Sequence, residues 1–108
     1  MRYPVRLSGL CRAAEVDNTS TWFAQIENIS HEGLKIVCRR PVEVGTKILI
    51  SPSDVSVLPR VARGVHVTCG SEGTWILGCE FTRELLDEAE LLSWIRSQNG
   101  KHPRDRAS

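Results

Sequence analysis

The residues best suited to chemistry stand in one short polar stretch, residues 28–33, with the sequence NISHEG. It lies between two apolar runs, residues 22–26 and 34–38, that both have the pattern of strands, so the stretch is predicted to be a turn. Asn28 and Ser30 can bond the nearby backbone, or can offer a carbonyl, an amide and a hydroxyl to a ligand. Gly33 can take positive φ and has no Cβ to hold a ligand away. An ordinary hairpin turn uses the same residue types, so the stretch alone fits either role.

A second candidate is the pair Arg2 and Arg6, four residues apart at the start of the chain. Pro4 prevents regular helix between them and disfavours a central strand, so residues 1–6 are expected to form an extended or looped arm. Both arginines could turn toward one anion, because the guanidinium fork fits phosphate and also the O6/N7 edge of guanine. The alternative is a frayed, solvated terminus.

Composition narrows the class of protein. At 108 residues, 41% hydrophobic and 25% charged, the chain should form one globular domain. The net charge of +1 gives no reason to expect bulk binding to nucleic acid or to an anionic membrane. Arginines interrupt any apolar leader, and no stretch approaches the length that spans a bilayer, so we expect a cytoplasmic protein without membrane insertion. The cysteines form no CxxC pair and are expected to be reduced, mostly buried and without a metal: Cys11, Cys38, Cys69 and Cys79.

The elements that position these residues follow from the spacing of apolar residues. Alternation predicts six strands, over residues 5–14, 21–28, 34–39, 47–51, 61–69 and 74–81. The spacing then becomes helical over residues 84–96, and Asn99-Gly100 is typical of a helix end. We therefore predict a mainly β domain over residues 1–97, an antiparallel barrel or strongly curved sheet whose open face or end is covered by the helix. Residues 98–108 are predicted to be a disordered polar and basic tail.

With these features in view, the chain resembles the PilZ domain family. That family is marked by RxxxR near the start and by [D/N]xSxxG some tens of residues later. Here the first motif runs from Arg2 to Arg6 and the second from Asn28 to Gly33. Residues 44–50 and 77–81 resemble the family's mid-domain strand entry and last strand, so the resemblance covers about residues 2–97. It implies an all-β (mainly) fold, a six-stranded antiparallel PilZ-type β-barrel with a C-terminal α-helix.

The resemblance also implies a function: a bacterial, cytoplasmic receptor for the second messenger cyclic di-GMP, with no catalytic activity and no cofactor. By that similarity Arg2 and Arg6 hold phosphates and guanine edges, while Asn28, Ser30 and Gly33 line the other side of the ligand. Binding is then expected to order the arm, and the signal would pass to an unidentified effector protein from a monomer or weak dimer.

Two departures from the family's pattern lower the expected affinity. Met1 stands where many binders carry an extra arginine, so the arm is short. Asn28 replaces the commoner aspartate, and a neutral amide accepts hydrogen bonds less strongly than a carboxylate.

Three other functions compete with this one. One is a PilZ-like protein-interaction adaptor with weak or no nucleotide binding, which the short arm would favour. Another is an OB-like barrel for nucleic acid, but the strands lack interleaved aromatic and basic residues, and large aromatics on strands such as Trp22, Phe23 and Trp75 usually belong to a core. An enzyme is the least favoured, because neither a GxSxG elbow nor a Walker A or GxGxxG phosphate loop is present.

Overall fold

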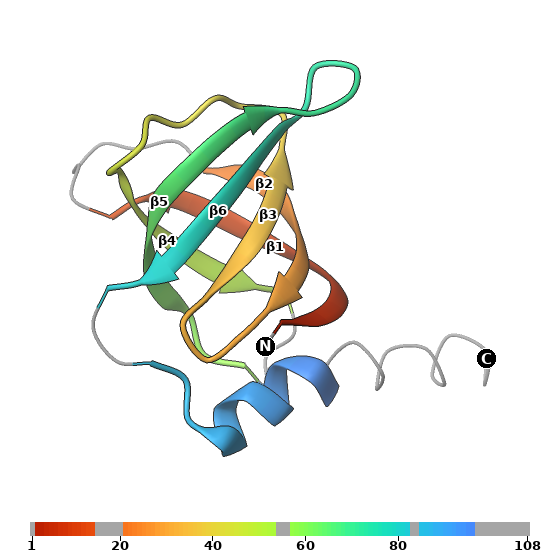
Figure 1. Cartoon of the computed structure of the whole chain (residues 1–108), viewed down its shortest axis with the longest axis vertical. Coiled ribbons are helices and arrows are strands. Elements are labelled where there is room, and N and C mark those ends of the chain that lie inside the picture. The colour runs from red at the N-terminus through yellow and green to blue at the C-terminus, as the bar shows by residue number, and fades with distance from the viewer. Residues whose placement is uncertain (1, 15–20, 54–56, 83–84, 97–108) are drawn as a thin grey trace.

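Six antiparallel strands close into a barrel in this computed structural model, which describes residues 2–14, 21–53, 57–82 and 85–96. The strands are β1 (Tyr3–Ala13), β2 (Trp22–Ile29), β3 (Gly33–Cys38), β4 (Lys47–Pro52), β5 (Arg60–Cys69) and β6 (Trp75–Phe81). Their order around the barrel is β1-β2-β3-β6-β5-β4, and β4 pairs back with β1 (Figure 1). The predicted fold class, a six-stranded antiparallel barrel with a C-terminal helix, is confirmed.

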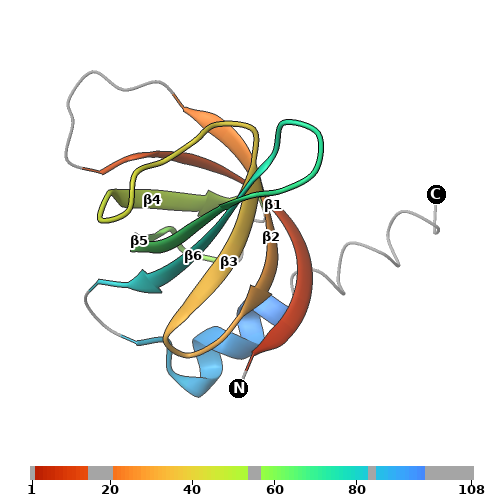
Figure 2. The same ribbon diagram turned by 45° about the horizontal axis from the view of Figure 1, so that its top comes forward.

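The barrel interior is filled by the apolar member of each alternating pair. Along β1, Val5, Leu7 and Cys11 point inward and are at most 7% exposed, and Gly9 is buried with them, while the alternate residues Arg6, Ser8 and Leu10 are exposed. Every strand contributes inward residues of this kind. Figure 2, which turns the molecule by 45°, shows the strands wrapping around that interior. Because successive side chains on a strand alternate between faces, a buried interior also fixes which residues form the outer surface.

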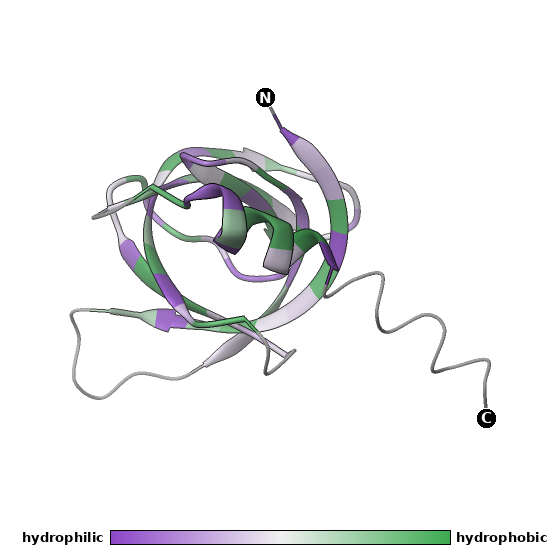
Figure 3. Ribbon diagram, turned by 90° about the horizontal axis from the view of Figure 1, so that it is seen from below, coloured by the Kyte–Doolittle hydropathy of each residue, from purple (hydrophilic) through white to green (hydrophobic). Residues whose placement is uncertain are grey.

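A short helix, residues 88–96 within the described chain, lies across one end of the barrel (Figure 3). Leu91 and Trp94, each 1% exposed, point from it into the core, and Leu86 just before it is also buried. Asp87 caps the helix: its carboxylate accepts a hydrogen bond from the backbone N–H of Glu90 at 2.8 Å. The helix therefore begins after Asp87, and the prediction that it would begin at residue 84 was wrong.

The start of β1 also differs from the prediction. The strand begins at Tyr3 and pairs with β2 through Tyr3–Ile29 and Pro4–Asn28, so the expected loose arm belongs to the barrel from Tyr3 onward. Proline is tolerated at this strand start because the register shifts immediately after it. The predicted tail, residues 98–108, lies outside the described residues.

The cysteines are free thiols, and three of the four are buried: Cys11, Cys38 and Cys79. Cys69 is exposed. Within the described residues, no cluster of three or more histidine, cysteine, aspartate or glutamate side chains could hold a metal ion. The described part of the chain also has no helix with the length and apolar character needed to cross a bilayer.

Candidate ligand-binding site

The turn between β2 and β3 is held by Ser30. The backbone N–H of Ser30 donates to the carbonyl of Gly33 at 2.8 Å, which closes the turn. The Ser30 hydroxyl oxygen accepts from the backbone N–H groups of Glu32 at 3.2 Å and Gly33 at 3.3 Å. Ser30 is only 2% exposed, so its side chain lies inside the turn and shapes it. The serine in this motif is therefore explained by local backbone bonding without any ligand.

Gly33 is glycine because β3 and β6 approach each other closely. It pairs with Glu80, and a Cβ at this position would overlap the carbonyl oxygen of Cys79 and lie 2.8 Å from the Glu80 Cα. Both neighbouring atoms are backbone and cannot rotate away. The close packing of β3 against β6 thus explains the glycine at position 33, where the sequence had suggested that the missing Cβ gives access to a ligand.

The turn is also fixed to the segment that leads into the helix. His31 and Leu86 exchange two bonds: the Leu86 N–H donates to the His31 carbonyl at 2.8 Å, and the His31 Nδ1 lies 2.7 Å from the Leu86 carbonyl. The His31 Nε2 lies 3.7 Å from a Glu88 carboxylate oxygen. The β2–β3 turn is therefore a rigid corner between the barrel wall and the helix (Figures 1 and 2).

The two sequence motifs meet at Asn28. An Arg2 guanidinium nitrogen, Nη1, donates to the Asn28 side-chain oxygen at 2.8 Å, although the residues are 26 apart in sequence. Near Asn28, strand β2 is irregular along both of its edges. Its register with β1 shifts between Pro4 and Leu7, and its register with β3 shifts between Ile26 and Asn28. Bulges of this kind re-aim side chains and are frequent next to binding sites.

Arg6 has a different environment. It falls within the β1 irregularity and its side chain is exposed. Among the described residues its guanidinium has no hydrogen-bond or ion-pair partner, so its donors face solvent. Arg6 does not line the depression that Arg2 and Asn28 share, so the structure brings only part of the expected set together.

That depression has a volume of about 340 Å³ and runs over the outer face of neighbouring strands. Besides Arg2 and Asn28, it is lined by Lys35 of β3, Ile76 and Gly78 of β6, and His66 and Thr68 of β5. Gly78 pairs with His66 across β5 and β6, and a Cβ at Gly78 would make ordinary van der Waals contact with the His66 side chain, 3.6 Å from its Cβ. Arg2 and Lys35 supply positive charge, His66 a flat ring and Asn28 an amide, a set suited to an anionic, planar ligand.

Sequence reasoning missed the five residues that β3, β5 and β6 contribute. Strand alternation places Lys35, Ile76 and Gly78 on the outer face, because their neighbours Leu34, Ile36, Leu77 and Cys79 are inward. His66 and Thr68 are exposed residues of β5. Their grouping depends on the order β3-β6-β5, which brings Lys35, Gly78 and His66 into one cross-strand row. The alternation was visible in the sequence; the strand order was not.

Comparison with known proteins identifies the architecture. The sequence matches neither a family model nor a characterised protein sequence. The structure, however, superposes on the PilZ domain of YcgR from Escherichia coli, solved with c-di-GMP, with a TM-score of 0.60. The match covers 99% of this chain and 94% of that one, at 15% sequence identity. At this identity the likeness concerns the fold, and the fold of this chain is that of a PilZ domain.

Proposed function

We propose that the chain is a receptor domain for cyclic di-GMP, which binds over the depression beside Asn28 and signals to a partner protein. The observation that carries the proposal is the Arg2–Asn28 hydrogen bond, because it joins the two motifs at the edge of a positively charged hollow. The PilZ fold supports it, since the similar domain of YcgR was solved with that ligand.

The chemistry of the lining fits this ligand. Cyclic di-GMP carries two phosphodiester anions and two guanines. Arg2 uses one N–H donor on Asn28 and keeps others for a phosphate or for the guanine O6/N7 edge, and Lys35 adds a second cation. The Asn28 oxygen has a further lone pair that can accept from guanine N1–H or N2–H. The faces of the His66 ring and the Arg2 guanidinium can stack on a purine.

Arg6, exposed on β1 four residues after Arg2, is proposed to contact the ligand from outside the depression. Its exposed guanidinium needs no bond to be broken before it meets a phosphate. Ser30 and Gly33 contribute by holding the corner from which Asn28 projects, rather than by contact through their side chains. Because β1 is already paired from Tyr3 and Arg2 is already bonded to Asn28, binding requires little ordering of the arm.

The test is isothermal titration calorimetry of the whole chain with cyclic di-GMP, and with GTP and cyclic di-AMP for comparison. Replacing Arg6 with alanine removes one or two charge-assisted bonds, worth about 1.5–3 kcal/mol each. The affinity should therefore fall at least about tenfold, since roughly 1.4 kcal/mol is a factor of ten. Arg2→Ala should cost the same or less, and Asn28→Asp should retain or improve affinity because a carboxylate holds Arg2 more strongly.

Arg12→Ala is the matched control, because Arg12 is an exposed arginine farther along β1, opposite Leu49 of β4. It should bind like the parent. Equal binding by the Arg2, Arg6 and Arg12 variants would show that the arginine pair is not the site. No heat with any nucleotide near millimolar concentration would favour the alternative function, an interaction adaptor with the same fold.

A further inference from the structure

His66 owes its place in the ligand-binding depression to an irregularity in β5. Gly64 pairs with Cys79 of β6. His66 pairs with the adjacent β6 residue, Gly78, so Val65 is an extra residue in the ladder. Gly64 is buried whereas His66 is exposed. Without the extra residue, strand alternation would turn the side chain at position 66 to the face of Gly64, so the bulge is what brings an imidazole to the outer surface here.

Two permanent cations and no carboxylate share the depression with His66. Arg2 and Lys35 carry the charge, and the other lining residues are uncharged: Asn28, Thr68, Ile76 and Gly78. Within the described residues, the ring nitrogens of His66 have no hydrogen-bond or ion-pair partner. The ring is therefore available to an anion that Arg2 and Lys35 attract.

The carboxylates of the surrounding strands and turns that the structure describes lie outside this lining: Glu27, Glu32, Glu43, Glu72 and Glu80. Glu80, the next outward residue of β6 after Gly78, accepts a hydrogen bond from Arg63 at 2.6 Å. On the far side of β5, Lys47 of β4 pairs with Arg63. The charges that share the depression with His66 are thus positive, and the negative charge there has to come from a ligand.

Imidazole is the side chain that ordinarily gains or loses a charge between about pH 5 and 8. When it is protonated, both ring nitrogens donate hydrogen bonds, and the cationic ring is also attracted to the face of a purine. A phosphodiester keeps its single negative charge throughout this range. An anion held beside His66 therefore favours the protonated ring, and its binding takes up a proton wherever the free ring is neutral.

We propose that His66 couples ligand binding in the depression to protonation, so that a dinucleotide with phosphodiester anions binds more tightly at mildly acidic pH than at alkaline pH. Affinity is highest where His66 is already protonated, and it falls as pH rises and the ring becomes neutral. The inference rests on the receptor function proposed above, and it adds a response to pH that Arg2 and Lys35 alone would not give.

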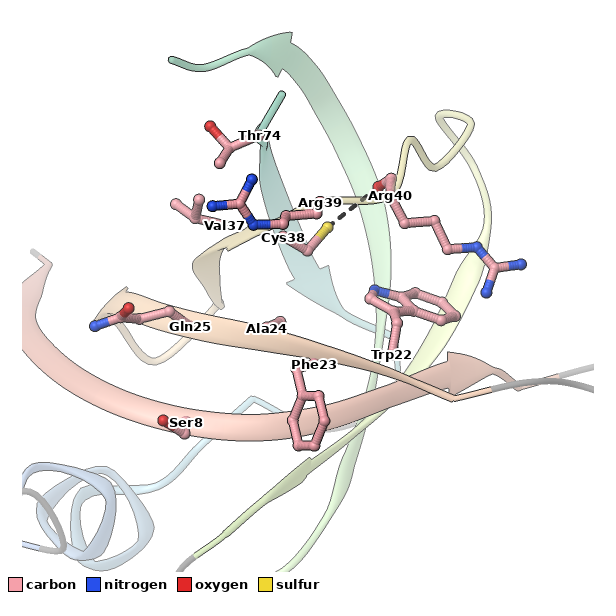
Figure 4. A pocket seen from close by; sticks show the side chains of 10 residues that line it. All are labelled: Ser8, Trp22, Phe23, Ala24, Gln25, Val37, Cys38, Arg39, Arg40 and Thr74. Atoms are coloured by element: carbon pink, nitrogen blue, oxygen red, sulfur yellow. Dashed lines mark hydrogen bonds between the residues drawn. The ribbon is translucent and has the colours of Figure 1, made fainter. Parts of the chain in front are cut away.

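A larger hollow of the same chain provides the contrast. It has a volume of about 650 Å³ and lies where β2 and β3 part, between Trp22 and Phe23 on one side and Arg39 and Arg40 on the other (Figure 4). The described residues that line it include neither a histidine nor a carboxylate. A ligand bound there would meet fixed charge only, so the response to pH also reports which hollow holds the ligand.

The experiment is isothermal titration calorimetry of the whole chain with cyclic di-GMP at four pH values from about 5.5 to about 8.5, at constant ionic strength. Each titration is repeated in two buffers with different heats of ionisation, which measures the protons taken up. The parent should bind at least about threefold more tightly at the lowest pH than at the highest, with proton uptake near neutral pH. His66→Gln, whose side chain cannot be protonated in this range, should lose both effects.

Two further variants sharpen the comparison. His66→Lys carries a permanent charge at the same position, so its affinity should not change with pH over this range. His31→Gln is the matched control, because His31 lies outside the depression and its ring bonds to the Leu86 carbonyl. It should keep the pH response of the parent. Melting temperatures are measured at both extremes of pH, so that loss of fold is not mistaken for loss of binding.

The outcomes separate this inference from the receptor function. Equal parent affinity at the two extremes of pH would overturn the inference and leave the receptor function standing. The same holds if His66→Gln keeps the response of the parent, because another group would then be titrating. Absence of binding at every pH would overturn the receptor function, and the inference with it.

Discussion

Replacing Gly33 with alanine tests whether this motif glycine serves packing or ligand access. The added methyl group would overlap the Cys79 carbonyl oxygen and lie 2.8 Å from the Glu80 Cα, so β3 and β6 must move apart. Overpacking of this kind costs about 1–3 kcal/mol. Losing one ladder hydrogen bond adds about 1 kcal/mol. We expect a total loss of roughly 2–4 kcal/mol, a large part of the 5–15 kcal/mol typical of a domain.

The matched control is Gly64→Ala. Gly64 is also a buried strand glycine, but a Cβ there would meet nothing closer than the Glu43 carbonyl oxygen at 3.9 Å. The free energy of unfolding of the Gly64→Ala variant should differ from that of the parent by less than about 1 kcal/mol. The assay is urea unfolding without ligand, followed by tryptophan fluorescence and far-ultraviolet circular dichroism.

Gly33→Ala should lower the urea midpoint with little change in slope, and should lower Tm by roughly 10–30 °C for a domain of this size. Gly64→Ala should unfold like the parent. A Gly33→Ala chain with parental stability but weaker nucleotide binding would refute the packing argument, because the glycine would then be serving the ligand.

Other predictions concern the turn, the core and the thiols. Ser30→Ala should lower the free energy of unfolding by about 1–3 kcal/mol, since the buried Gly33 N–H and the partly buried Glu32 N–H lose their acceptor; parental urea stability would contradict this. Trp94→Ala should cost about 3–5 kcal/mol by leaving a cavity under the helix, measurable in the same way. Burial, with smaller contributions from neighbouring thiols, raises the pKa of Cys11 and Cys79 from 9.0 to about 12. Unfolding releases these protons above pH 9, so stability should fall between pH 9 and 12 by up to about 1.4 kcal/mol per pH unit for each thiol. Iodoacetamide at mildly alkaline pH should modify exposed Cys69 first; faster labelling of Cys11 would contradict the burial argument.

The barrel could be predicted from the sequence because its inward and outward residues alternate cleanly. On β6 the predicted inward face, Trp75, Leu77, Cys79 and Phe81, is the one that packs on the core. Strand limits agree to within one or two residues, as expected where turns carry glycine, proline and polar residues. The pattern of apolar, polar and turn residues along each strand was therefore sufficient to predict which side chains face inward and where the strand ends.

Features that depend on distant partners were not predicted. Pro4 suggested a free arm, but β2 offers it a pairing position next to an irregularity. Asp87 lies inside the helix range predicted from spacing, whereas its carboxylate caps a helix that starts later, after Leu86, which is bonded to His31. The grouping of Lys35, Gly78 and His66 around the depression likewise follows from the strand order β3-β6-β5.

The environments of the two motifs imply that they would respond differently to mutation over time. A chain selected only for stable folding would keep Ser30 and Gly33, because the turn and the β3–β6 contact require them. The same chain could lose Arg2 and Arg6 without harm, since both side chains are exposed. Folding of this chain therefore constrains Ser30 and Gly33, whereas Arg2 and Arg6 would be retained by selection only for the ligand binding proposed above.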